Sequence, residues 1–226
     1  MRHNSTLVLL ILFAFTLFGQ SSKKISYLAL GDSYTIGESV KESQRWPNLL
    51  ADSLVKAGYE VEKPIIIAKT GWRSDELISA IEKRPDLMQF DLVSLLIGVN
   101  NQYQGKDIAV FKKEFKALLQ VAIDHSKKGA GGVFVLSIPD YGVTPFAASK
   151  KPAKISREIK LYNTVCREIC EQKNILFIDI TPISREARTQ TNLLASDELH
   201  PSSLMYQKWT SLIMKNLNKV NLKSVK

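Results

Sequence analysis

Histidine and cysteine are scarce in this chain of 226 residues, which contains only three histidines and two cysteines. Two cysteines cannot form the dense disulfide framework of a small secreted scaffold or, by themselves, the four-ligand set of a structural zinc site. No apolar run is long enough for a membrane-spanning helix, which needs about twenty residues. The sequence shows no internal repeat and no low-complexity tract. With 45% hydrophobic and 23% charged residues, the composition excludes a disordered chain and a polytopic membrane protein, and the length indicates one globular domain.

Acidic residues are outnumbered by basic ones, with 22 Asp and Glu against 31 Lys and Arg, which gives a net charge of +9. A platform for single-stranded nucleic acid would need basic residues interleaved with aromatic ones, and this pattern is not found. Neighbouring lysines occur instead in separate segments, at Lys23–Lys24, Lys112–Lys113, Lys127–Lys128 and Lys150–Lys151. We therefore interpret the charge as solvated helix faces and loops, and expect no nucleic-acid partner.

Residues 1–21 have the pattern of a secretory signal peptide. Arg2 precedes an apolar stretch at 7–19, after which residues 20–24 turn polar. The stretch suits the apolar region of a signal peptide, and no cysteine follows it to accept a lipid. An uncleaved membrane anchor is the alternative. We expect an exported protein, periplasmic or secreted, without a stable membrane anchor, in which residues 22–226 form the mature domain.

The two cysteines, Cys166 and Cys170, are four residues apart in a segment with helical periodicity. Two positions one helical turn apart are often poorly oriented for a disulfide, although an exported protein meets oxidising conditions. We expect two buried thiols on one helix face, with a local disulfide as the alternative. The pair alone would leave a metal ion under-coordinated.

Short runs rich in Ile, Val and Leu alternate with longer amphipathic segments along the chain. Such short runs are typical of parallel strands covered on both faces, and they occur at 25–30, 65–68, 92–97, 133–138 and 175–180. Helical patterns occupy 47–57, 74–82, 107–128, 155–173 and 202–217. This alternation predicts an α/β protein, a three-layer α/β/α sandwich around a five-stranded parallel sheet with right-handed crossovers.

Small and polar residues follow the first three predicted strands, where Ser33, Gly71 and Asn100 stand. Open parallel sheets bind their ligands outside the carboxyl ends of the strands, so these residues are expected at one edge. The backbone amides of Ser33 and Gly71 and the side-chain amide of Asn100 would supply three donors to an oxyanion. Each residue taken singly is also typical of an ordinary turn. It is their shared position that indicates an oxyanion hole.

A serine hydroxyl becomes a good nucleophile when a base accepts its proton, and His200 is the candidate base. The other two histidines lie in the leader and in a lysine-rich helix end. Pro201 disfavours the helical conformation for the residue before it, so His200 is expected in a loop. Asp197 is close enough in sequence to accept a hydrogen bond from the outer imidazole nitrogen. We therefore predict that Ser33, Asp197 and His200 form a catalytic triad.

In these motifs the chain resembles the SGNH hydrolase superfamily, the GDSL-like lipases and esterases. The resemblance extends across nearly the whole mature chain and is carried by Leu30–Thr35, Gly71, Gly98–Asn101 and Asp197–Pro201. It implies a flavodoxin-like sandwich and an ester hydrolase with a Ser-His-Asp triad, a three-donor oxyanion hole, and no metal or organic cofactor. One position departs from the pattern, because Asn101 stands where the third motif often has an aspartate. This departure puts a supporting hydrogen bond in question.

The substrate is expected to be a small-molecule, lipid or carbohydrate ester bound by a monomer. Trp72, Tyr103, Tyr141 and Phe146 follow the predicted strands and are candidates for the pocket lining, although aromatic residues there are as often simple packing. The closest resemblance is to small exported bacterial esterases of the lysophospholipase and thioesterase type or to a general carboxylesterase. A carbohydrate acetylesterase is the alternative. Outside the enzymes, a catalytically inert glycan-binding module and an FMN-binding flavodoxin-like module are the further alternatives.

Overall fold

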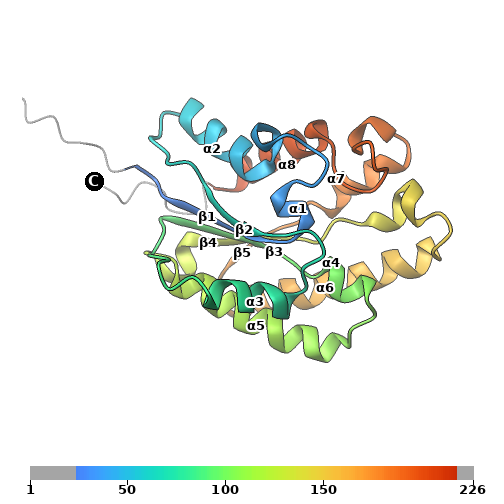
Figure 1. The fold of residues 1–226 in the computed structure, drawn as a ribbon, viewed down its shortest axis with the longest axis horizontal. Coiled ribbons are helices and arrows are strands. Elements are labelled where there is room, and N and C mark those ends of the chain that lie inside the picture. Colours follow the sequence, from blue (N-terminus) through green and yellow to red (C-terminus); the bar gives the residue numbers. More distant parts are fainter. Residues whose placement is uncertain (1–23, 218–226) are drawn as a thin grey trace, which may run out of the picture.

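The computed structural model describes residues 24–217, which form a five-stranded parallel sheet between two layers of helices (Figure 1). The strand order is β2-β1-β3-β4-β5, the order of flavodoxin-like sheets. The strands are β1 (Tyr27–Gly31), β2 (Ile65–Ala68), β3 (Leu92–Leu96), β4 (Val133–Leu136) and β5 (Leu176–Ile178). The three-layer sandwich expected from the alternating pattern is confirmed.

The helices divide between the two faces of the sheet. One face is covered by α1 (Ser33–Ile36), α2 (Trp46–Lys56), α7 (Thr181–Arg185) and α8 (Ser203–Leu217). The other face is covered by α3 (Ser74–Glu82), α4 (Val99–Tyr103), α5 (Ile108–Asp124) and α6 (Pro152–Gln172). Within residues 24–217, no helix combines the length and the apolar character that a membrane crossing requires. The predicted signal peptide lies outside the described residues.

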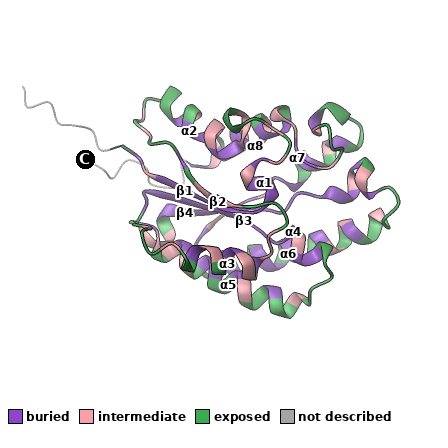
Figure 2. Ribbon diagram, viewed as in Figure 1, coloured by how far each residue is buried: buried purple, intermediate pink, exposed green. Residues whose placement is uncertain are grey.

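The core lies in the sheet and on the inner helix faces (Figure 2). Every residue of β1, β3 and β4 is buried, whereas β2 and β5 at the two edges are partly exposed. The continuous apolar runs of the three central strands suit this position, because helices cover both faces of the sheet. One polar pair is placed between central strands, where the Tyr27 hydroxyl and Ser94 Oγ are 2.8 Å apart.

Two of the predicted helix ends were wrong by several residues. The segment predicted to be helical through residue 128 ends at Asp124, because the next residues pair with the backbone of Phe90. The N–H of Phe90 donates to His125 O at 2.8 Å, and its carbonyl accepts from Lys127 N at 2.9 Å. Helix α6 begins three residues earlier than predicted, at Pro152, whose fixed φ suits the first helical position.

Cys166 and Cys170 are buried free thiols on α6. Burial raises the pKa of the Cys170 thiol to about 12 and that of Cys166 well above its ordinary value. Both groups therefore stay protonated at neutral pH and act as small apolar side chains. The prediction of two buried thiols is confirmed.

Candidate active site

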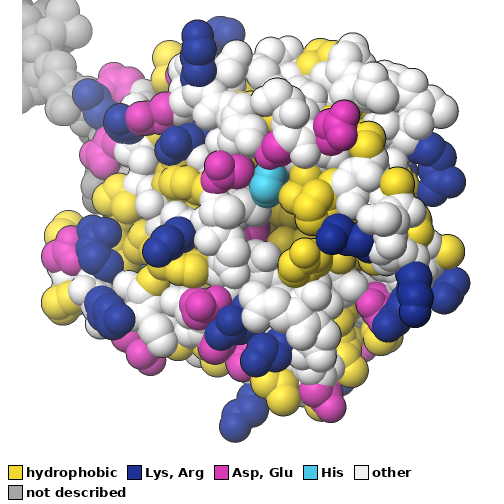
Figure 3. All heavy atoms as spheres, turned by 45° about the vertical axis from the view of Figure 1, so that its right-hand side comes forward, with side chains coloured by type: hydrophobic (Ala, Val, Ile, Leu, Met, Phe, Trp, Pro, Cys, Tyr) yellow, Lys and Arg dark blue, Asp and Glu magenta, His cyan; other side chains and the backbone are white. Residues whose placement is uncertain are grey.

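A pocket of about 170 Å³ opens at the carboxyl edge of the sheet. Its lining includes Ser33, Gly71, Asn100 and His200, so the structure brings together four residues that the sequence singled out. They come from the ends of β1, β2 and β3 and from the loop before α8. In the space-filling view a histidine lies in a hollow, with hydrophobic and acidic side chains around it (Figure 3).

Ser33 begins the short helix α1, immediately after β1. Asp32 caps this helix, because its carboxylate accepts the N–H of Tyr34 at 3.0 Å. Gly31 has no space for a side chain, since an added Cβ would overlap Thr35 and lie 2.5 Å from Leu96 O. The backbone at Gly31 therefore packs closely against Thr35 and Leu96, and this packing holds the turn that presents Ser33.

Asp32 is fully buried, and its second carboxylate oxygen has no hydrogen-bond partner among residues 24–217. Burial raises the pKa of Asp32 to about 7, although the hydrogen bond from Tyr34 acts in the opposite direction. A buried, half-satisfied carboxyl directly before Ser33 is costly for the fold. Such a cost is typical of functional sites.

His200 and Asp197 form the hydrogen-bonded pair that the sequence predicts. His200 Nδ1 is 2.7 Å from Asp197 Oδ2, while the other carboxylate oxygen accepts the backbone N–H of Leu199 at 3.0 Å and of His200 at 2.9 Å. Burial alone would raise the pKa of Asp197, but the hydrogen bonds from Ser39, His200 and the backbone outweigh it and lower the pKa to about 2. Asp197 is therefore ionised at neutral pH, which favours a proton on Nδ1 and leaves Nε2 of His200 free to accept one.

The candidate oxyanion donors lie on the neighbouring loops. Gly71 has a φ of 86°, a conformation that favours glycine, and its missing side chain would point into open space. The Asn100 side chain donates one N–H to Trp72 O at 2.9 Å, which fixes the amide and leaves its second N–H for a ligand. The loop after β2 and the start of α4 are thereby tied together.

Asn101 supplies the support that its departure from the family pattern had put in question. Its side-chain oxygen accepts the N–H of Ser74 at 3.0 Å, and its amide donates to Ser74 Oγ at 2.6 Å and to Glu114 Oε2 at 3.3 Å. An aspartate could accept from the Ser74 N–H but could not donate to the Glu114 carboxylate. The asparagine therefore matches the acidic neighbour that this chain carries on α5.

Three aromatic rings form one wall of the pocket: Tyr103, Tyr141 and Phe146. Tyr103 lies 6.1 Å from Tyr141 and 6.3 Å from Phe146 between ring centroids. The Lys150 ammonium lies over the Phe146 ring at 4.7 Å. Trp72, the other aromatic candidate, lies partly buried against the hydrophobic core. Leu199 and Thr70 also line the pocket, and no pattern in the sequence marks either of them as a pocket residue.

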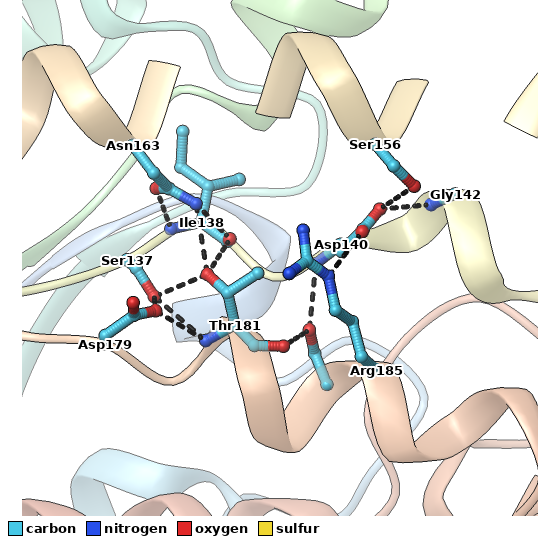
Figure 4. Close-up of polar contacts among 10 residues, drawn as sticks. Ser137, Ile138, Asp140, Gly142, Ser156, Asn163, Asp179, Thr181 and Arg185 are labelled. Atoms are coloured by element: carbon cyan, nitrogen blue, oxygen red, sulfur yellow. Dashed lines mark hydrogen bonds and ion pairs between the residues drawn. The ribbon is translucent and has the colours of Figure 1, made fainter. Parts of the chain in front are cut away.

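A buried polar network fixes the segment that carries Tyr141 (Figure 4). The Asp140 carboxylate accepts hydrogen bonds from Gly142 N at 3.0 Å and Ser156 Oγ at 2.9 Å, and pairs with Arg185 Nε at 2.9 Å. Asn163 of α6 holds the preceding segment, donating to Ile138 O at 2.9 Å and accepting from Ile138 N at 2.7 Å. These contacts hold the backbone on both sides of Tyr141, one of the three aromatic residues of the wall.

The fold and the residues that line the pocket agree with the resemblance to SGNH hydrolases seen in the sequence. The sequence pattern of the GDSL-like Lipase/Acylhydrolase family matches residues 29–208, so the chain belongs to this family and is an ester hydrolase. A comparison with curated protein sequences gives no match. Membership of this family favours the esterase over the FMN-binding alternative.

Solved structures share the fold at low sequence identity. The lipase/acylhydrolase from Enterococcus faecalis has a TM-score of 0.68 and 20% identity, over 88% of this chain and 99% of that one. TesA has a TM-score of 0.68 and 18% identity, over 86% and 99%. An acetylxylan esterase from Geobacillus stearothermophilus has a TM-score of 0.65 and 18% identity, over 89% and 96%.

Proposed function

We propose that the protein is a serine esterase that acts through an acyl-enzyme, with Ser33, His200 and Asp197 as its triad. The observation that carries this proposal is that His200, which is hydrogen-bonded to Asp197, lines the same pocket as Ser33. A carboxylate that orients an imidazole toward a serine is the arrangement that activates a hydroxyl nucleophile.

In the first step, Ser33 Oγ attacks the ester carbonyl carbon while His200 Nε2 takes its proton. The oxyanion accepts hydrogen bonds from the N–H groups of Ser33 and Gly71 and from the Asn100 amide. The tetrahedral intermediate then expels the alcohol, which leaves with the proton from His200. Water attacks the acyl-enzyme by the same steps and releases the carboxylic acid.

The size of the pocket supports a short acyl group. A cavity of about 150 Å³ holds one benzene molecule, and the volume here is about 170 Å³. The wall formed by Tyr103, Tyr141 and Phe146 offers apolar contact to such a group. A long acyl chain, as in lysophospholipids or fatty acyl thioesters, would have to extend beyond the pocket over the surface.

A carbohydrate acetylesterase is the second candidate. The small pocket suits an acetyl group, and one of the similar structures is an acetylxylan esterase. Acetate release from acetylated xylo-oligosaccharides, compared with p-nitrophenyl acetate, tests this candidate. A higher kcat/KM on the oligosaccharide would favour it over a general carboxylesterase.

The test of the main proposal is hydrolysis of p-nitrophenyl acetate, butyrate, octanoate and palmitate by the purified protein. We expect the highest kcat/KM on acetate or butyrate, with at least about a 10-fold fall by octanoate. Ser33→Ala should lower kcat by roughly 10³- to 10⁶-fold. Near-wild-type rates in Ser33→Ala would refute the proposal, and a folded wild type inactive on every ester would favour the inert glycan-binding alternative.

We also propose that the protein acts after export, in the periplasm or outside the cell. The pattern of residues 1–21 supports this location. Cell fractionation combined with N-terminal sequencing tests it. A chain that retains Met1 in the cytoplasmic fraction would contradict it.

A further inference from the structure

The segment that follows α1 reaches two other parts of the candidate site. Ser39 Oγ donates a hydrogen bond of 2.5 Å to Asp197 Oδ2, the same oxygen that lies 2.7 Å from His200 Nδ1. The adjacent Glu38 accepts a hydrogen bond from the Thr70 hydroxyl, and Thr70 directly precedes the candidate oxyanion residue Gly71. Two consecutive side chains therefore join the loop after Ser33 to both the acid and the oxyanion loop.

The backbone of this segment is held in a conformation that serine rarely adopts. Ser39 has a φ of 64°, in the left-handed region. The segment is anchored at Ser33 itself, whose carbonyl accepts the N–H groups of Gly37 and Glu38, each at 3.0 Å. Non-glycine residues kept in this region carry backbone strain, and such strain gathers at functional sites. Here the strained residue directs its hydroxyl at the triad carboxylate.

We propose that Ser39 is a positioning residue of the esterase, whose hydroxyl holds the Asp197 carboxylate in register with His200. The hydrogen bond between Glu38 and Thr70 has a similar positioning role, because it holds the loop that carries Gly71. The proposal rests on the proposed function, because positioning matters only if the His200 and Asp197 pair takes part in catalysis.

The hydrogen-bond count at Asp197 indicates what loss of the hydroxyl would do. The carboxylate accepts from Ser39, from the His200 side chain and from two backbone N–H groups. Without the Ser39 hydroxyl, Asp197 Oδ2 loses one fixed hydrogen-bond donor. Water can take the place of this donor, because 31% of the Asp197 side chain is exposed. The carboxylate then becomes more basic and less fixed, so it stabilises the protonated imidazole of His200 more strongly.

Other titratable groups lie near the pair, and all of them are unchanged in the variants proposed below. Glu198 lies next to Asp197 in the chain, the Tyr34 ring lies 5.6 Å from the His200 ring, and Tyr206 interacts with Asp197 as well as with Asp32, Glu38 and Arg45. A change in the pH profile on substitution of Ser39 therefore reports the hydroxyl and not a new charge.

The experiment compares Ser39→Ala and Ser39→Gly with the wild type, using steady-state kinetics on p-nitrophenyl acetate from pH 5 to 9. Alanine removes the hydroxyl and keeps the strained Cβ, whereas glycine removes the hydroxyl and accepts the positive φ without strain. We expect both variants to lower kcat by about 3- to 10-fold with little change in KM. The acid limb of kcat/KM should move to higher pH in both. Ser43→Ala, on the same exposed stretch, is the matched control and should leave the profile unchanged.

The outcomes separate the two proposals. If Ser39→Gly has a wild-type kcat and pH profile, the hydroxyl does not position the triad, and the inference is overturned even where Ser33→Ala is inactive. If Ser33→Ala keeps its activity, the proposed function itself fails. Should Ser39→Ala not fold, Ser39→Gly alone decides, because glycine suits the observed backbone.

Discussion

Replacing Asn101 with aspartate should destabilise this protein, although it restores the residue common in the family. The new carboxylate oxygen would stand where the amide nitrogen now lies, 3.3 Å from Glu114 Oε2. Two unit charges at that distance repel by about 5 kcal/mol at an effective dielectric constant of about 20. Asn101 is 1% exposed, so water cannot screen the pair well. We expect a loss of about 2–5 kcal/mol in the free energy of unfolding at pH 8.

The effect should depend on pH in one direction. Repulsion raises the pKa of one carboxyl of the pair in the folded state, so the folded variant binds a proton that the unfolded chain releases near pH 4. Stability is therefore lost as pH rises from about 4 through the raised pKa, and it is largely retained in acid. Urea unfolding at pH 5 and pH 8, followed by circular dichroism, measures the difference.

The double variant Asn101→Asp with Glu114→Gln is the control. It removes the second charge and provides an amide that can donate a hydrogen bond to the introduced carboxylate. We expect it to recover most of the lost stability at pH 8. An Asn101→Asp protein as stable as the wild type at pH 8 would refute the reasoning. So would a double variant that recovers nothing.

Three further predictions concern the turn at Ser33 and the loops that carry the candidate oxyanion donors. Asn100→Ala should lower kcat about 10²- to 10³-fold on p-nitrophenyl acetate, while the midpoint of thermal unfolding changes little. Gly31→Ala should destabilise the fold by about 1–3 kcal/mol, measured by urea unfolding, because the new Cβ overlaps Thr35 and the backbone at Leu96. Asp32→Asn keeps the helix cap but cannot ionise. Because the pKa of Asp32 is raised to about 7 in the folded protein, wild-type stability falls as pH rises from about 4 to 7, so the melting temperature of the variant should exceed that of the wild type more at pH 8 than at pH 5.

The layered fold follows from local patterns in the sequence. The bounds of β2 and α3 agree with the predicted segments 65–68 and 74–82, since turn residues and a clear change of period mark their ends. The C-terminal end of α5 does not follow from such patterns. There the backbone of Phe90, far away in the chain, pairs with residues 125–127 and ends the helix.

Sequence patterns likewise predict one part of the candidate site and not the other. Ser33, Gly71 and Asn100 could be placed together, because parallel strands bring their carboxyl ends to one edge. Ser39 could not, since its contact with Asp197 joins residues 158 positions apart and no spacing rule marks a lone serine in a loop. The positive φ that marks Ser39 as unusual is visible only in the structure.

Covalent labelling of the nucleophile tests the central claim most directly. The purified protein and Ser33→Ala would be treated with a p-nitrophenyl alkylphosphonate, and intact mass and peptide mapping would locate the adduct. We predict one adduct per chain, on Ser33, formed much more slowly in His200→Ala and absent from Ser33→Ala. A label on another residue, or equal labelling of Ser33→Ala, would contradict the assignment of Ser33 as the nucleophile.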